Sequence, residues 1–124
     1  MNKLQKTKCH TIIHAAASSA AVIGAGLAQL PTSDTVPLMG IQTTMVIAVA
    51  KVFGKSITQE AAKATATSMA AGYVGRGVSQ VVLGWLPGLG NVVNASTAFA
   101  LTEFVGWAAA KHFEKKSIWN LFST

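Results

Sequence analysis

Leu86-Pro87-Gly88-Leu89-Gly90 separates two long apolar segments of the chain, residues 64–85 and 91–111. Proline cannot continue a helix, because it lacks the amide N–H and its ring clashes with the preceding turn, whereas glycine adopts the backbone angles of a tight reversal. The stretch therefore predicts the turn of a helical hairpin, with one helix on each side of it.

Each arm of this predicted hairpin carries a row of small or polar residues at every fourth position, which forms one face of a helix. Small side chains at this spacing let two helix backbones approach closely, as they do where helices pack within lipid. The first row is Ala64, Ser68, Gly72, Arg76, Gln80 and Gly84, and the second is Asn94, Ala98, Thr102, Gly106 and Ala110. We expect the small members to pack helix against helix and to join copies of the chain into a homo-oligomer: Ser68, Gly72, Gly84, Ala98 and Gly106.

The composition indicates an all-α protein of helical hairpins. The chain has 124 residues, of which 51% are hydrophobic and 11% are charged, whereas about a quarter are charged in an average soluble protein. This length suits one domain of about four helices. Because so few residues can form a soluble surface, the sequence predicts insertion into a membrane.

Two further helices are predicted before the hairpin, over residues 11–30 and 37–53. A bilayer requires about 20 apolar residues, so the first is long enough to span it and the second lies at the short limit. The first could equally be a buried helix of a bundle, because it is rich in alanine and serine. We expect a membrane domain over residues 11–113, a basic segment over 1–10, and a basic and aromatic tail over 114–124.

The net charge of +6 comes mostly from the two ends of the chain. The positions expected at the membrane surface are Lys3, Lys6, Lys8, Lys111, Lys115, Lys116 and Trp119. Basic residues stay on the cytoplasmic side of a membrane, so four spans with both termini and the central loop on that side satisfy the charge pattern. Trp119 could instead fold back into the core. Nucleic-acid binding is not predicted, because the lysines are clustered at the ends and the chain has a single arginine.

Arg76 and Glu103 are the charges inside the predicted hairpin. Counted from Gly88, their positions differ by about one helical turn, so the side chains could pair within the membrane or line a polar lumen. Both could also face water, if the hairpin is only partly immersed. The other candidate polar positions are Gln42, Gln80, Asn94 and Thr102.

The sequence lacks a recognisable constellation for catalysis. A dinucleotide-binding motif needs a third glycine after a strand, and a phosphate-binding loop needs a following Lys-Ser or Lys-Thr. The glycine-rich stretches of this chain have neither, so they do not predict a nucleotide site. Cys9, His10 and His14 offer too few ligands to predict a metal site. We therefore expect no enzymatic activity, no metal and no cofactor.

Four blocks of the sequence resemble the GTPase-associated helical domain of unknown function, which also occurs in YcjF-type inner-membrane proteins. The blocks are PLMGIQTTM at 37–45, VFG at 52–54, LPGLG at 86–90 and ALTEFVGW at 100–107. Their order matches that family, and the resemblance covers about residues 30–113. It implies helical hairpins that associate with the inner membrane of a bacterium and are often linked to a GTPase, which leaves open a GTPase partner in trans, and it places Gln42 and Glu103 on recurring positions. The chain departs from the common arrangement because it carries no GTPase domain.

Three functional hypotheses follow. The first is a membrane-inserted protein that self-associates through its glycine and alanine faces and forms a pore or channel. The second is a membrane anchor whose basic ends and central loop recruit a GTPase or another cytoplasmic protein. The third is a soluble, alanine-rich helical bundle.

Overall fold

The computed structural model describes the backbone of residues 1–26, 35–74 and 95–123, and the side chains of residues 1–22, 38–72 and 98–115. These residues form four helices and no strand: α1 (Lys3–Gly26), α2 (Thr35–Val52), α3 (Gln59–Val74) and α5 (Ala95–Ser123). The prediction of an all-α fold with about four helices is confirmed.

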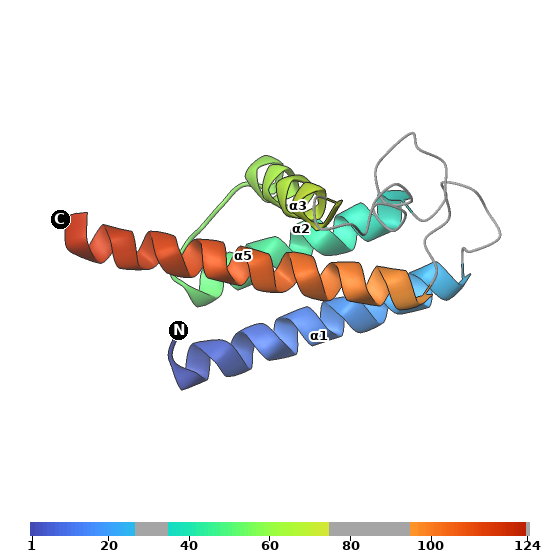
Figure 1. Ribbon diagram of the computed structural model, residues 1–124, viewed down its shortest axis with the longest axis horizontal. Helices are drawn as coiled ribbons and strands as arrows, with labels where there is room; N and C mark the ends of the chain where they lie inside the picture. Colours follow the sequence, from blue (N-terminus) through green and yellow to red (C-terminus); the bar gives the residue numbers. More distant parts are fainter. Residues whose placement is uncertain (27–34, 75–94, 124) are drawn as a thin grey trace.

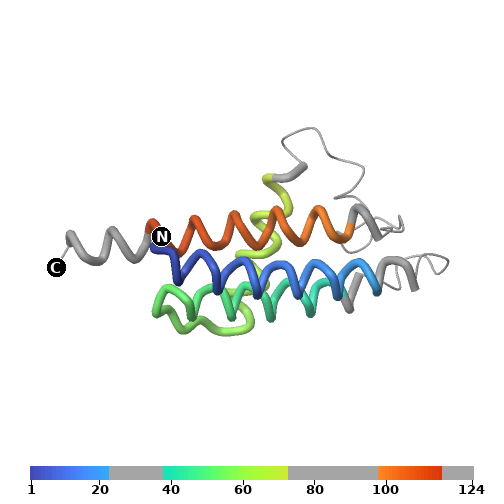
Figure 2. Tube along the Cα trace, turned by 90° about the horizontal axis from the view of Figure 1, so that it is seen from below, coloured from blue at the N-terminus to red at the C-terminus, as the bar shows by residue number. Residues whose placement is uncertain are grey.

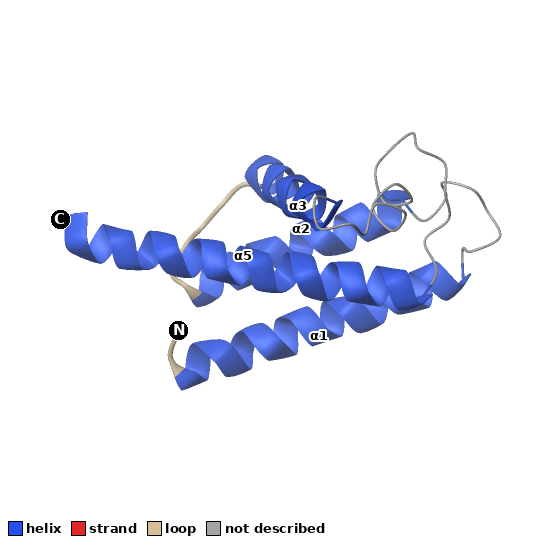
Figure 3. Cartoon of the chain, in the orientation of Figure 1, coloured by secondary structure: helices blue, strands red, loops and turns tan. Residues whose placement is uncertain are grey.

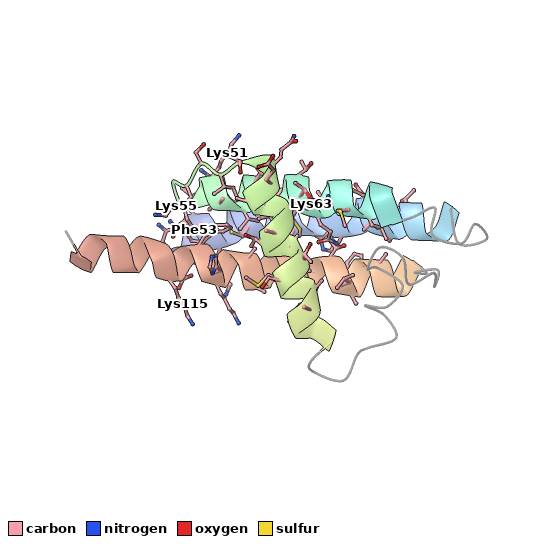
Figure 4. All side chains as sticks on the ribbon, turned by 90° about the horizontal axis from the view of Figure 1, so that it is seen from above. Lys51, Phe53, Lys55, Lys63 and Lys115 are labelled. Atoms are coloured by element: carbon pink, nitrogen blue, oxygen red, sulfur yellow. The ribbon has the colours of Figure 1, made fainter. Side chains whose placement is uncertain are left out.

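Three of the helices, α1, α2 and α5, run along the long axis of the molecule (Figures 1 and 2). Helix α2 and helix α5 are each antiparallel to α1, and all three are in mutual contact. Helix α3 crosses α2 and α5 (Figure 4) and, within the described residues, makes no contact with α1. The fold is therefore a three-helix bundle with a fourth helix laid across one side, and the connection between α2 and α3 is a short loop (Figure 3).

The helix ends follow from local sequence. Asn2 and Gln5 form a capping box at α1, in which the Gln5 amide donates to Asn2 Oδ1 at 2.7 Å and the Asn2 amide to Gln5 Oε1 at 3.0 Å. Gly54, with a φ of 74°, ends α2, because glycine takes this left-handed conformation without steric cost. Thr58 caps α3 by accepting a hydrogen bond from the Ala61 amide at 3.1 Å. The end of α2 at Val52 agrees with the predicted limit at residue 53, whereas α3 begins at Gln59, before the predicted start of the hairpin arm at residue 64.

Gly106 marks the closest packing of the bundle. A Cβ atom added there would lie 2.7 Å from Ile13 Cγ1 and Cγ2, on α1, and 3.0 Å from Met45 Sδ, on α2. Ala98, which belongs to the same row, is also buried. Gly106, one of the positions expected to pack helix against helix, thus lies against α1 and α2 of the same chain. The expected packing between copies of the chain stays a prediction.

The described members of the first small-residue row lie on the outer side of α3. Helix α3 buries Ala62, Ala66 and Ala70, whereas Ser68 and Gly72 are exposed and a Cβ added to Gly72 would meet nothing within 4 Å. Within one chain these two positions therefore pack against no described helix, because α3 lies across the bundle and turns a different stripe of alanines toward it.

The predicted helix limits also change at both ends of the chain. Helix α1 begins at Lys3, so the basic N-terminal segment is its first turns, and α5 continues through the predicted tail to Ser123. Among the described residues, no helix combines the length and the apolar character needed to cross a bilayer. The turn at Pro87, Gly88 and Gly90 lies outside the described residues.

Candidate functional site: a lysine-rich end of the bundle

The lysines of the bundle gather at the end where both termini and the loop between α2 and α3 lie (Figures 1 and 2). We call this group the lysine end. It consists of Lys3, Lys6 and Lys8 on α1, Lys51 and Lys55 at the end of α2, and Lys111 and Lys115 on α5. Six of the seven are exposed and Lys55 is half-buried. Figure 4 shows Lys51 and Lys55 at this end on one side of the bundle and Lys115 at the same end on the opposite side, while Lys63 lies farther along, on α3.

The antiparallel arrangement of the helices brings these residues together. The first turn of α1, the last turn of α2 and the C-terminal half of α5 must share one end of a bundle in which α1 is antiparallel to both others. An ion pair marks this register, since the N-terminal ammonium of Met1 lies 3.0 Å from Glu114 Oε2. Glu114 stands between Lys111 and Lys115 in the sequence, so these lysines lie beside the start of α1.

Charge is strongly segregated along the bundle. The parts of the four helices farther from the lysine end, residues 11–26, 35–50, 64–74 and 95–102, contain no Lys, Arg, Asp or Glu. Of the other charged side chains that the structure describes, Glu114 is held by the N-terminal ammonium, Glu103 contacts His14, and Glu60 and Lys63 lie at the start of α3. The lysine end therefore produces a positive potential on one pole of the described bundle.

Cys9 lies beneath this end, in the core between α1 and its neighbours. Burial raises the pKa of the Cys9 thiol, and the carboxylate of Glu114 raises it further. A raised pKa keeps the thiol protonated, and the thiolate is the reactive form of cysteine.

We expect Cys9 to resist alkylation by iodoacetamide in the native protein and to react fully in denaturant, with mass spectrometry as the readout. Because the folded protein disfavours the thiolate, the contribution of Cys9 to stability is complete below its unfolded pKa and is lost as the pH rises through the folded value. Unfolding measured on both sides of the ordinary thiol pKa should show this decline, and the Cys9→Ala variant should lack it. Rapid native labelling at neutral pH would contradict the buried position.

A buried polar pair joins α2 to α5 midway along the bundle. Gln42 Nε2 donates a hydrogen bond to Thr102 Oγ1 at 2.7 Å, and Thr102 Oγ1 donates to the backbone oxygen of Ala98 at 2.8 Å. Both side chains are fully buried, and Gln42 Oε1 has no hydrogen-bond partner in the described part of the chain. The sequence placed both residues among the candidate polar positions, and the structure pairs them within one chain.

A second polar contact joins α1 to α5 at the surface. His14 Nδ1 lies 3.2 Å from Glu103 Oε1. The His14 ring stacks on His10 with ring centroids 5.7 Å apart, and Phe99 and Trp107 meet the two imidazoles edge-on. Sequence reasoning missed this pair, because only the antiparallel register of α1 and α5 brings positions 14 and 103 together. No group of three His, Cys, Asp or Glu side chains in the described residues is arranged to hold a metal.

Several predicted site residues lie outside the part of the chain that the structure describes. They are Arg76, Gln80, Gly84, Pro87, Gly88, Gly90 and Asn94. The predicted pairing of Arg76 with Glu103 is among them, and the described neighbour of Glu103 is His14. Lys116 and Trp119 belong to the last turns of α5, close to the lysine end in sequence, but their side chains are not described.

No protein-family model, curated protein or solved structure matches the chain. The resemblance to the GTPase-associated helical domain stays a prediction that depends on its four sequence blocks. Within the described structure, the lysine end is the feature that points most directly to a partner.

Proposed function

We propose that the protein attaches to anionic membranes through its lysine end. The observation that carries this proposal is that the three segments of the chain that carry these seven lysines lie at one end of the bundle. A lysine near an anionic bilayer surface contributes about 1 kcal/mol to binding. Several lysines on one rigid face can therefore act together, whereas lysines spread around the molecule could not all reach the lipid.

The proposed orientation places the bilayer against the lysine end. Both termini and the loop between α2 and α3 then face the same leaflet. This agrees with the charge pattern of the sequence, which favours the cytoplasmic side for all three. The cytoplasmic leaflet is the natural partner because it carries the anionic lipids. For a bacterial protein this is the inner face of the cytoplasmic membrane. Full insertion of four helices has less support, since no described helix is suited to crossing a bilayer.

Self-association is a second part of the proposal. Ala98 and Gly106 are occupied by contacts within the chain, so they do not remain available for a second copy. The small side chains of Ala64, Ser68 and Gly72 are exposed on the outer face of α3, and this face would join copies. A pore built from several copies would have to line its path with residues near this face or outside the described structure.

An adaptor role is the alternative. Lys51 and Lys55 flank the exposed loop between α2 and α3, and Lys63 follows on α3. An acidic surface of a GTPase, or of another cytoplasmic protein, could use the same positive pole. A partner that is captured through this loop in the absence of lipid would favour the adaptor over the membrane-surface protein.

Removing three lysines tests the proposal by vesicle co-sedimentation. Wild-type protein should sediment with vesicles that contain phosphatidylglycerol and stay in solution with pure phosphatidylcholine vesicles. We expect the triple variant Lys51→Ala, Lys55→Ala and Lys115→Ala to bind the anionic vesicles about 100-fold more weakly, given about 1 kcal/mol per lysine. Raising the salt concentration should weaken wild-type binding in the same way.

A matched control separates the position of the charge from its amount. The triple variant Ser18→Glu, Val22→Glu and Ala100→Glu lowers the net charge by the same three units at exposed positions far from the lysine end and outside the α3 face. It should bind anionic vesicles nearly as well as wild type. Equal losses in the two variants, or equal wild-type binding to both vesicle types, would refute the proposed orientation.

A further inference from the structure

A groove of about 530 Å³ lies between α1 and α2. Small and apolar side chains line most of it, and Ser19 and Thr44 contribute the hydroxyls. Its walls include Ile12, Ala15 and Ser19 on α1 and Gly40, Thr44 and Ala48 on α2. This size and this lining are typical of sites for small apolar ligands, which measure about 300–1,000 Å³.

The groove is accessible. Its lining contains no residue of α3 or α5, because α5 packs against the opposite sides of α1 and α2. Gly40 is exposed, and a Cβ atom added to it would meet nothing within 4 Å. The absence of a side chain at Gly40 thus keeps one end of the groove open.

Two lysines stand at the other end of the groove. Lys8 lies one helical turn before Ile12, and Lys51 about one turn after Ala48, so each continues the stripe that lines the groove. Because the helices are antiparallel, both lysines lie at the same end, and both are exposed. The axial distance from Lys8 to Ser19 is about 16 Å at about 1.5 Å per residue. The result is an open apolar groove between α1 and α2 with a lysine of each helix beyond one end.

We propose that this groove binds a free long-chain carboxylate, with the acyl chain along α1 and α2 and the carboxylate between Lys8 and Lys51. The apolar walls match a single acyl chain, and the paired ammonium groups match one anionic head. A phospholipid taken out of a bilayer would leave its second chain in water, so a free single-chain amphiphile suits the groove better. The proposal does not rest on membrane attachment through the lysine end.

The first test is calorimetric titration with laurate below its micelle concentration. Wild-type protein should bind laurate, and the Gly40→Leu variant, which fills the open end of the groove, should bind it at least about tenfold more weakly. The control is Gly72→Leu, the same substitution at an exposed helical glycine on α3 with free space around its Cβ position. Equal affinities for all three proteins would overturn the site.

The second test separates the apolar walls from Lys8 and Lys51. Hexanoate shares the carboxylate but fills less of the groove, and dodecanol shares the chain but lacks the charge, so both should bind more weakly than laurate. The double variant Lys8→Ala and Lys51→Ala should lose affinity for laurate but not for dodecanol. Lys63→Ala with Lys115→Ala, a control of equal charge, should bind laurate like wild type. An equal loss in both double variants would refute the role of Lys8 and Lys51 and leave only a general charge effect.

The same variants distinguish this site from the membrane-binding surface. Gly40→Leu should leave vesicle co-sedimentation unchanged, because it alters no charge at the lysine end. Binding of vesicles without binding of laurate would overturn the groove proposal alone, and binding of laurate without vesicles would overturn the membrane proposal alone.

Discussion

Replacing Gly106 by leucine is expected to lower the free energy of unfolding by about 3 kcal/mol, at the upper end of the usual cost of overpacking. The first added atom would already lie 2.7 Å from two carbons of Ile13 and 3.0 Å from Met45 Sδ. Both Ile13 carbons branch from its Cβ, and a β-branched side chain has one strongly preferred χ1 rotamer in a helix, so the rotation that would relieve these contacts is unfavourable. Urea unfolding followed by far-UV circular dichroism would measure the loss.

Two companion variants make the Gly106 prediction specific. Gly72→Leu should be neutral or stabilising by up to about 1 kcal/mol, because leucine favours a helix over glycine and free space surrounds this position. Ile13→Ala should destabilise the wild type by leaving a cavity, yet it should stabilise the Gly106→Leu protein by making room. If Ile13→Ala destabilises both backgrounds equally, α1 does not pack on Gly106 as described.

Replacing Thr102 by valine is the second substitution with a large expected effect, a loss of about 1–3 kcal/mol. The change preserves the shape of the side chain but removes the oxygen that accepts the hydrogen bond from Gln42 Nε2. Since Gln42 Oε1 already lacks a partner, the whole buried amide would then be unpaired. Thermal or urea unfolding of the variant provides the measurement.

Two control variants test whether the loss comes from the buried hydrogen bond between Gln42 and Thr102. Thr7→Val removes an exposed hydroxyl that also donates to the backbone oxygen four residues earlier, and it should change stability by less than about 0.5 kcal/mol. Combining Gln42→Leu with Thr102→Val replaces the pair by apolar groups of similar volume and should recover most of the loss. A double variant no more stable than Thr102→Val would show that the amide reaches water.

The second small-residue row was predictable in part from the sequence. A glycine and an alanine eight residues apart mark a helix face that approaches another helix closely, and Gly106 and Ala98 do so in the structure. The spacing contains no information about which helix will approach. Gly72 has the same pattern around it and faces away from the bundle, because the alanine stripe at Ala62, Ala66 and Ala70 fits the crossing of α3 over α2 and α5 equally well.

The convergence of the lysines at one end of the bundle was predictable, because it depends only on where the lysines stand in the sequence and on the direction of each helix. Lysines at the two chain ends and after the second helix must converge if the helices alternate in direction, and the sequence sets that alternation through its breakers. The partner of Glu103 was not predictable in this way. Its contact with His14 depends on the axial register of α1 against α5, which is set by the packing around Gly106. The buried pairing of Gln42 with Thr102 depends on tertiary packing for the same reason.

The most direct test of the account measures which end of the bundle meets an anionic bilayer. A single environment-sensitive fluorophore would be attached at Ser56→Cys, in the exposed loop at the lysine end, or at Val22→Cys, where α1 is 73% exposed far from that end. Cys9 is buried, so native labelling reaches only the introduced thiol. If the lysine end meets the bilayer, vesicles that contain phosphatidylglycerol should shift the fluorescence emission to the blue at position 56 and leave it unchanged at position 22. A shift at position 22 alone, or at neither position, would contradict this orientation.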